Sequence, residues 1–182
     1  MSDDLRIGVI GCSGRGKLAY HAHKPGKGSR LVAGCDILQT ALDEFRENHG
    51  EDVFLCKDYR ELIARDDIDA VFVTTPDYWH EEHALASLNA GKHVYLEKPM
   101  AITVEGCDRI MSLAREKGLK LYVGHNMRHM SFVQKMKELI DSGRIGEVKA
   151  GWCRHFVAYG GDAYFKDWHA ERSKSTSLLL PK

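Results

Sequence analysis

The sequence lacks an excess of charge of either sign. Its 182 residues include 26 lysine and arginine residues and 26 aspartate and glutamate residues, so the formal net charge is zero. A nucleic-acid-binding surface needs a basic excess or a basic face, so this balance argues against a nucleic-acid partner. The one basic concentration consists of Arg15, Lys17, Lys24, Lys27 and Arg30. We interpret it as a solvated helix face that also suits phosphate groups.

Cysteine is scarce, and long apolar runs are absent. The five cysteines are odd in number and show no C-x-x-C spacing, which argues against a disulfide framework or a zinc scaffold and favours free thiols in a reducing compartment. No apolar run approaches membrane-spanning length, and the acidic residues 1–4 do not resemble a signal peptide. We therefore expect a cytoplasmic protein without a membrane partner.

The histidines are numerous but lack the spacing of metal ligands. His80 and His83 are three positions apart, which fits neither H-E-x-x-H nor H-x-x-E-H. His125 and His129 fall in a segment that we expect to be a loop. We predict no metal site. We expect His80 to orient the loop at Thr75 or to border the cofactor pocket, and His83 and His129 to be surface or satisfied histidines.

A glycine-rich turn follows the first apolar run. Residues 7–10 predict a short buried strand, and the chain then turns before a helix expected near Lys17. The turn consists of Gly11, Cys12, Ser13, Gly14, Arg15 and Gly16. Such a turn brings backbone N–H groups and a helix N-terminus together, which favours binding of a pyrophosphate. Gly11 and Gly16 occupy the outer positions of the G-x-G-x-x-G fingerprint, but Ser13 replaces its middle glycine.

An aspartate stands where the same fingerprint requires an acid. Asp36 follows a second apolar run at residues 30–35 and lies 20 residues after Gly16. We expect its carboxylate to bind the ribose hydroxyls of a dinucleotide, in preference to the alternative that it merely caps the next helix. Ile37 and Leu38 supply no cation for a 2′-phosphate, so we expect NAD in preference to NADP.

The rest of the chain alternates between strand and helix patterns up to residue 123. Further strands are expected at 52–56, 69–74, 93–96 and 119–123, and helices at 18–23, 40–49, 58–64, 80–90 and 103–117. Thr40 and Asp58 are the expected caps of two of these helices. This alternation predicts an α/β fold with a Rossmann-type doubly wound parallel sheet.

The pattern changes after His125. A helix is expected at 132–142, followed by a strand of alternating character at 146–158, and residues 178–180 are leucines without an element to bury them. We place a dinucleotide-binding domain at 1–126 and the beginning of a truncated α+β domain, for substrate binding and oligomerisation, at 127–182. A strand without its partner sheet would leave an edge prone to association.

Ligands of doubly wound sheets bind outside the carboxyl ends of the strands. This criterion adds Thr74, Thr75, Pro76, His80, Glu97, Lys98 and Asn126 to the candidate cofactor-binding residues. Lys98 is also the candidate catalytic residue, because a lysine beside a cofactor can polarise a hydroxyl or carbonyl and assist proton transfer. The alternative is a surface ion pair with Glu97 or another carboxylate, and Pro99 weighs against it by fixing the backbone after the lysine.

Four segments resemble the family of glucose–fructose oxidoreductase, inositol dehydrogenase and MocA. They are Thr-Thr-Pro-Asp-Tyr-Trp-His (74–80), Ala-Gly-Lys-His-Val-Tyr-Leu-Glu-Lys-Pro (90–99), Gly-His-Asn-Met-Arg (124–128) and Ile-Asp-Ser-Gly-Arg-Ile-Gly-Glu-Val (140–148). The resemblance covers residues 6 to about 158. It implies a nicotinamide dinucleotide, a sugar, inositol or related polyol as substrate, Lys98 as the catalytic lysine and a homo-oligomer in the complete form. Trp168-His169 falls where the family often has Trp-Arg near the nicotinamide.

The sequence departs from this family in two respects. Ser13 replaces the middle glycine, and the family's catalytic histidine lies in a segment that residues 177–182 only begin. Three interpretations remain. The first is an NAD-dependent polyol or sugar dehydrogenase, at least in its complete form. The second is a non-catalytic dinucleotide-binding sensor or partner subunit, and the third uses transient oxidation in glycoside cleavage.

Overall fold

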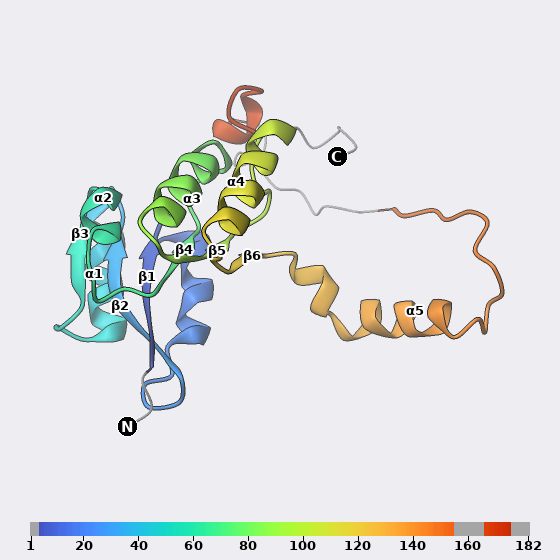
Figure 1. Cartoon of the computed structure of the whole chain (residues 1–182), viewed down its shortest axis with the longest axis horizontal. Helices are drawn as coiled ribbons and strands as arrows, with labels where there is room; N and C mark the ends of the chain where they lie inside the picture. The colour runs from blue at the N-terminus through green and yellow to red at the C-terminus, as the bar shows by residue number, and fades with distance from the viewer. Residues whose placement is uncertain (1–3, 155–165, 176–182) are drawn as a thin grey trace.

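Six parallel strands form one sheet, in the order β3-β2-β1-β4-β5-β6, in the computed structural model, which describes residues 4–154 and 166–175 (Figure 1). The strands are β1 (Leu5–Ile10), β2 (Ser29–Cys35), β3 (Phe54–Cys56), β4 (Ala70–Val73), β5 (His93–Leu96) and β6 (Leu121–Val123). The helices, with 3-10 helices written η, are η1 (Gly14–Ala22), α1 (Gln39–His49), α2 (Tyr59–Ile63), η2 (Asp77–Trp79), α3 (His80–Asn89), α4 (Val104–Glu116), η3 (Asn126–His129), α5 (Ser131–Asp141) and η4 (Trp168–Ala170). The direction of winding reverses between β1 and β4, which confirms the predicted doubly wound sheet.

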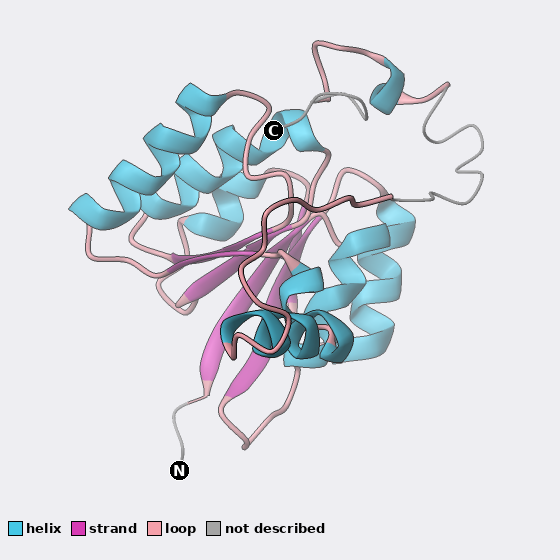
Figure 2. Cartoon of the chain, turned by 90° about the vertical axis from the view of Figure 1, so that its right-hand side faces the viewer, coloured by secondary structure: helices cyan, strands magenta, loops and turns pink. Residues whose placement is uncertain are grey.

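Helices cover both faces of the sheet, as Figure 2 shows. Ile7 and Val9 of β1 belong to one buried cluster, which includes Phe45 of α1. Ile10 belongs to a second cluster, which includes Leu88 of α3 and Ile110 of α4. Alternate side chains of a strand point to opposite faces, so β1 must be apolar almost throughout, as its sequence is.

Of the two predicted helix caps, the one at Asp58 is found and the one at Thr40 is not. The Asp58 side chain accepts a hydrogen bond from Arg60 N–H at 2.9 Å and caps α2, as predicted. The predicted cap at Thr40 is wrong. Helix α1 begins at Gln39 with Leu38 as its N-cap residue, and no side chain caps it. The Asp36 carboxylate accepts the Leu38 N–H at 3.0 Å, which turns the chain into the helix before Thr40 is reached.

The helix after the glycine turn differs from the prediction in type and start. It is a 3-10 helix that begins at Gly14, where the sequence predicts a helix near Lys17. Only Gly16 and Ala19 are buried in it. Two glycines and a small buried face give this segment little stabilisation as an α-helix, and short 3-10 structure is the common outcome.

The predicted strand at 146–158 is wrong in the part that the structure describes. Residues 146–154 form no strand, and 155–158 lie outside the described residues, as do the leucines at 178–180. Helix α5 and the segment after it extend away from the sheet (Figure 1). A strand requires a neighbour to satisfy its backbone groups, and the described part of the chain places none there. Phe132, Met136 and Ile140 of α5 are accordingly exposed.

Membrane-spanning helices and metal-ligating clusters are both absent from the described residues. No helix among them has the length and apolar character needed to cross a membrane. No group of three or more histidine, cysteine or acidic side chains in the described ranges could hold a metal ion.

Candidate functional site

The predicted site residues lie at the carboxyl ends of the strands. The turn from Gly11 to Gly16 follows β1, Asp36 follows β2, Thr74 to Pro76 follow β4, and Glu97 and Lys98 follow β5. Asn126 begins η3 after β6 and is exposed. Because all strands are parallel, these segments share one edge of the sheet.

The glycine turn is closely packed against the segment after β4. Gly11 has φ +89°, and a Cβ on it would lie 2.9 Å from Thr75 N. A Cβ on Gly16 would lie 2.1 Å from the carbonyl oxygen of Gly11. The same oxygen accepts a hydrogen bond from the Thr74 hydroxyl at 2.8 Å. Glycine is therefore required at both positions if the chain is to approach a ligand closely.

The remaining turn residues differ in exposure. Ser13, Gly14 and Arg15 are exposed, whereas Cys12 is buried in the core. Burial raises the pKa of the Cys12 thiol to about 12. Only the backbone of Cys12 can therefore face a ligand, while its side chain packs below the turn.

Asp36 connects the glycine turn to the start of α1. One carboxylate oxygen accepts the Ser13 N–H at 3.1 Å and the other accepts the Leu38 N–H at 3.0 Å. Asp36 is buried, with 7% of its surface exposed, and this exposed part lines a cleft. A carboxylate has about four acceptor sites, so two hydrogen bonds leave capacity for ligand hydroxyls.

The cleft has a volume of about 570 Å³ and brings together residues from four strand ends. Of the predicted residues it is lined by Gly11, Ser13, Asp36, Thr74, Thr75 and Pro76. Cys12, Gly14, Arg15, Gly16, His80, Glu97, Lys98 and Asn126 do not line it. The cleft is therefore bounded by the segments after β1, β2, β3 and β4, and the segments after β5 and β6 do not line it.

Two further groups of lining residues were not predicted. The first, residues 57–60, directly follows β3, so the rule of strand ends could have selected it from the sequence. The second comprises Tyr78, Trp79, Glu82 and His83, at η2 and the start of α3. The sequence carries no signal for this group, because a helical residue can face either the cleft or the solvent.

His83 is a satisfied histidine in the wall of the cleft. Its Nδ1 atom lies 3.1 Å from the Thr75 hydroxyl oxygen, and its ring stacks on Trp79 at 5.5 Å between centroids. Burial lowers the pKa of His83 to about 4, so the ring is neutral near neutral pH. The expectation of a satisfied histidine is confirmed, and its place in the cleft is new.

His80 connects two of the strand-end segments, in agreement with the expectation that it orients the loop at Thr75, and it does not line the cleft. The side chain is only 1% exposed. Its Nε2 atom lies 2.7 Å from the carbonyl oxygen of Thr75, and its Nδ1 atom lies 2.6 Å from that of Pro99.

Glu97 is a buried carboxylate with an unused acceptor. One oxygen accepts the Lys98 N–H at 3.2 Å. The other, Oε1, is buried and has no hydrogen-bond partner among the described residues. A Cβ on Gly124 would lie 2.9 Å from this oxygen and 2.6 Å from the Tyr95 hydroxyl. Burial is the larger cause that raises the pKa of Tyr95, and the negative charge of the Glu97 carboxylate is the second.

Lys98 is exposed, and no acidic side chain in the described part of the chain holds it. Among the described residues, no carboxylate forms an ion pair with its ammonium group, and the bond to Glu97 is made by its backbone N–H. Lys92 at the opposite end of β5 provides a contrast, because its ammonium group is buried and donates to the carbonyls of Arg65 and Ile68. Within the described residues, the alternative of a surface ion pair is therefore not found for Lys98.

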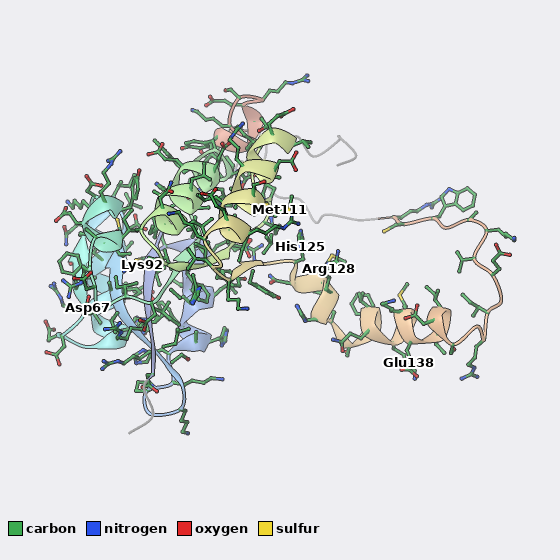
Figure 3. The ribbon with its side chains drawn as sticks, viewed as in Figure 1. Asp67, Lys92, Met111, His125, Arg128 and Glu138 are labelled. Atoms are coloured by element: carbon green, nitrogen blue, oxygen red, sulfur yellow. The ribbon has the colours of Figure 1, made fainter. Side chains whose placement is uncertain are left out.

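Two further segments lie near this edge. Figure 3 shows His125 and Arg128 where the chain leaves β6 toward α5. The Trp168 ring lies edge-on to Tyr78, a lining residue of the cleft, with centroids 5.9 Å apart. His129, expected to be an ordinary histidine, is exposed and bonds to the Tyr122 hydroxyl at 2.6 Å.

The sequence matches a known family over most of the sheet domain. The profile of GFO_IDH_MocA, described as an oxidoreductase family with an NAD-binding Rossmann fold, matches residues 5–125. An inositol 2-dehydrogenase from Ralstonia nicotianae is 35% identical over 167 residues, which cover 90% of this chain and 49% of that relative.

Two solved structures share the fold. A scyllo-inositol dehydrogenase from Lactobacillus casei, with bound NAD(H) and scyllo-inositol, has a TM-score of 0.73 at 27% identity, covering 80% of this chain and 43% of that one. A mutant 3-ketoreductase from Actinomadura kijaniata, in complex with TDP-benzene and NADP, has a TM-score of 0.72 at 31% identity, covering 81% of this chain and 45% of that one. The chain spans less than half the length of these three relatives.

Proposed function

The chain belongs to the glucose–fructose oxidoreductase, inositol dehydrogenase and MocA family, and on this premise we propose that it is the cofactor-binding part of an NAD-dependent dehydrogenase for a sugar, inositol or related polyol. One observation carries the proposal. The cleft at the reversal of the sheet is lined together by Gly11, Asp36 and Thr74, from three different strand ends. These are the residue types that a dinucleotide requires at that place.

The residues present fit a dinucleotide in two ways. The turn can keep this closely packed shape beside the cleft only because Gly11 and Gly16 lack a Cβ, which would meet backbone atoms at 2.9 and 2.1 Å. The unpartnered Oε1 of Glu97 offers a buried acceptor for a ligand hydroxyl beside Lys98. A buried acceptor without a donor is costly, so a ligand that supplies one is stabilised there.

Asp36 supports NAD in preference to NADP. Its two oxygens already accept backbone N–H groups, which holds the carboxylate at the cleft wall with acceptor sites left for two ribose hydroxyls. A 2′-phosphate would meet this negative charge. One cation of the wall, Arg60, lies 3.4 Å from Asp58 and 3.7 Å from Glu82, so its charge is already compensated.

Lys98 would act on the substrate. The bound nicotinamide supplies the acceptor for a hydride from the substrate carbon. The Lys98 ammonium, with no acid to compete for it among the described residues, would donate a hydrogen bond to the substrate hydroxyl and lower the cost of removing its proton.

The experiment is a fluorescence titration of the 182-residue chain with NADH and NADPH. We expect saturable binding with higher affinity for NADH. Absorbance of NADH is then followed with NAD and a panel of inositols and aldoses. Binding without turnover is expected of the cofactor-binding part alone, and absence of binding would refute the proposed function.

A further inference from the structure

His80 joins the two segments that border the candidate site. It is the first residue of α3, immediately after η2, and is 1% exposed. Its ring lies between the segment after β4 and the segment after β5, 2.7 Å from the Thr75 carbonyl and 2.6 Å from the Pro99 carbonyl. One buried side chain therefore connects a wall of the cleft to the residue that follows Lys98.

Both contacts are to main-chain carbonyl oxygens, so they hold the backbone of Thr75 and Pro99 in place. A carbonyl oxygen only accepts, so a ring N–H must make each hydrogen bond. A neutral imidazole carries one N–H and can donate to one of the two carbonyls, whereas an imidazolium carries two and can donate to both. A buried carbonyl that loses its donor costs about 1–3 kcal/mol. The rigid ring also sets the separation of the two carbonyls, which a flexible side chain would not do.

Lys98 has little else to set its position. The side chain is exposed and forms no ion pair with a described residue, so its place depends on the backbone of residues 97–99. On one side this backbone is held by the Lys98 N–H bond to Glu97 at 3.2 Å. On the other side it is held by the Pro99 carbonyl bond to His80.

We propose that His80 is a positioning residue, which fixes Lys98 relative to the Thr75 wall of the cleft so that the lysine lies beside the nicotinamide end of a bound dinucleotide. The proposal rests on the proposed function. It differs from a role in core packing alone, since packing requires the volume of the ring and not its N–H donors.

The experiment measures how well NADH protects Lys98 from acylation by an amine-specific reagent, with the modified lysines quantified by mass spectrometry. The parent chain, His80→Leu and His80→Gln are each titrated with NADH and then labelled at ten times their own Kd. At that concentration about one chain in eleven is free, so a lysine covered by the ligand is acylated about tenfold more slowly. Because each variant is equally saturated, loss of affinity alone cannot remove protection.

We expect about tenfold protection of Lys98 in the parent chain and less than about threefold in His80→Leu, because the saturated ligand no longer covers a displaced lysine. His80→Gln keeps donors for one carbonyl and should give an intermediate value. His49→Leu is the matched control, since His49 packs against Phe45 on α1 and contacts neither segment. It should retain full protection.

The outcomes separate the two proposals. If the parent chain does not bind NADH, the proposed function fails and the role of His80 fails with it. If NADH binds and His80→Leu retains tenfold protection, His80 does not position Lys98 although the proposed function stands. If His80→Leu does not fold, full protection in His80→Gln would overturn the proposal in the same way.

Discussion

Replacement of Gly16 by alanine tests the proposed dinucleotide turn most directly. The new Cβ would lie 2.1 Å from the Gly11 carbonyl oxygen and 3.0 Å from its carbon, and both are backbone atoms that cannot rotate away. Contacts under 3.0 Å are essentially never seen for real Cβ atoms, so the turn has to open. The Gly11 oxygen also accepts the Thr74 hydroxyl at 2.8 Å, and this bond would be strained or lost.

The magnitude follows from these two effects. Overpacking costs about 1–3 kcal/mol, and loss of a hydrogen bond adds about 0.5–1.5 kcal/mol. We expect Gly16→Ala to lower the free energy of unfolding by about 2–4 kcal/mol in urea titrations. The affinity for NADH should fall at least tenfold, about 1.4 kcal/mol, because the displaced turn no longer receives the pyrophosphate.

Two controls separate steric clash from backbone strain. Gly14 has φ +49° and no atom within 4 Å of the position that an alanine Cβ would take, so Gly14→Ala reports the cost of a left-handed alanine, about 1–2 kcal/mol. Gly151 has neither a positive φ nor a neighbour within 4 Å of that position, so Gly151→Ala should be neutral. A Gly16→Ala chain with the stability and NADH affinity of the parent would refute the steric account of the turn.

Three further predictions concern other residues of the site. Asp36→Ala removes a charged acceptor worth about 1.5–3 kcal/mol, so calorimetry should show NAD binding weakened about 10- to 150-fold, and tighter binding of NADP than of NAD to the parent would contradict the role of Asp36. In a longer form that turns over, Lys98→Met should lower kcat by about 10²–10⁴ with cofactor affinity and melting temperature nearly unchanged, and a normal kcat would exclude acid/base assistance. Burial lowers the pKa of His83 to about 4 from an ordinary value of 6.5, so between these pH values the unfolded chain binds a proton that the folded chain does not, and stability falls as the pH is lowered from 7 to 4. The fall should be smaller in His83→Gln by urea titration at both pH values, and equal pH dependence in the two chains would show that His83 is not responsible.

The place of the site could be predicted because it depends on strand order and strand ends. The apolar runs at 7–10 and 69–74 and the helices between them require a parallel sheet, and the carboxyl ends of its strands select Gly11, Asp36 and Lys98 without any coordinates. The wrongly predicted strand arose where a local pattern had no tertiary partner. The segment at 146–154 alternates like a strand but has no neighbouring strand among the described residues.

The amino-acid sequence by itself determined the order of the elements, the glycine turn and the acid at the end of β2, because each depends on local periodicity and on residue types at fixed spacing. Only the tertiary structure decided that Asp36 binds Ser13 N–H, that His80 joins Thr75 to Pro99, and that Glu97 keeps a buried oxygen to which no described residue donates. The bonds from Asp36 to Ser13 and from His80 to Pro99 join residues 23 and 19 positions apart, and they exist only once the sheet brings its strand ends together.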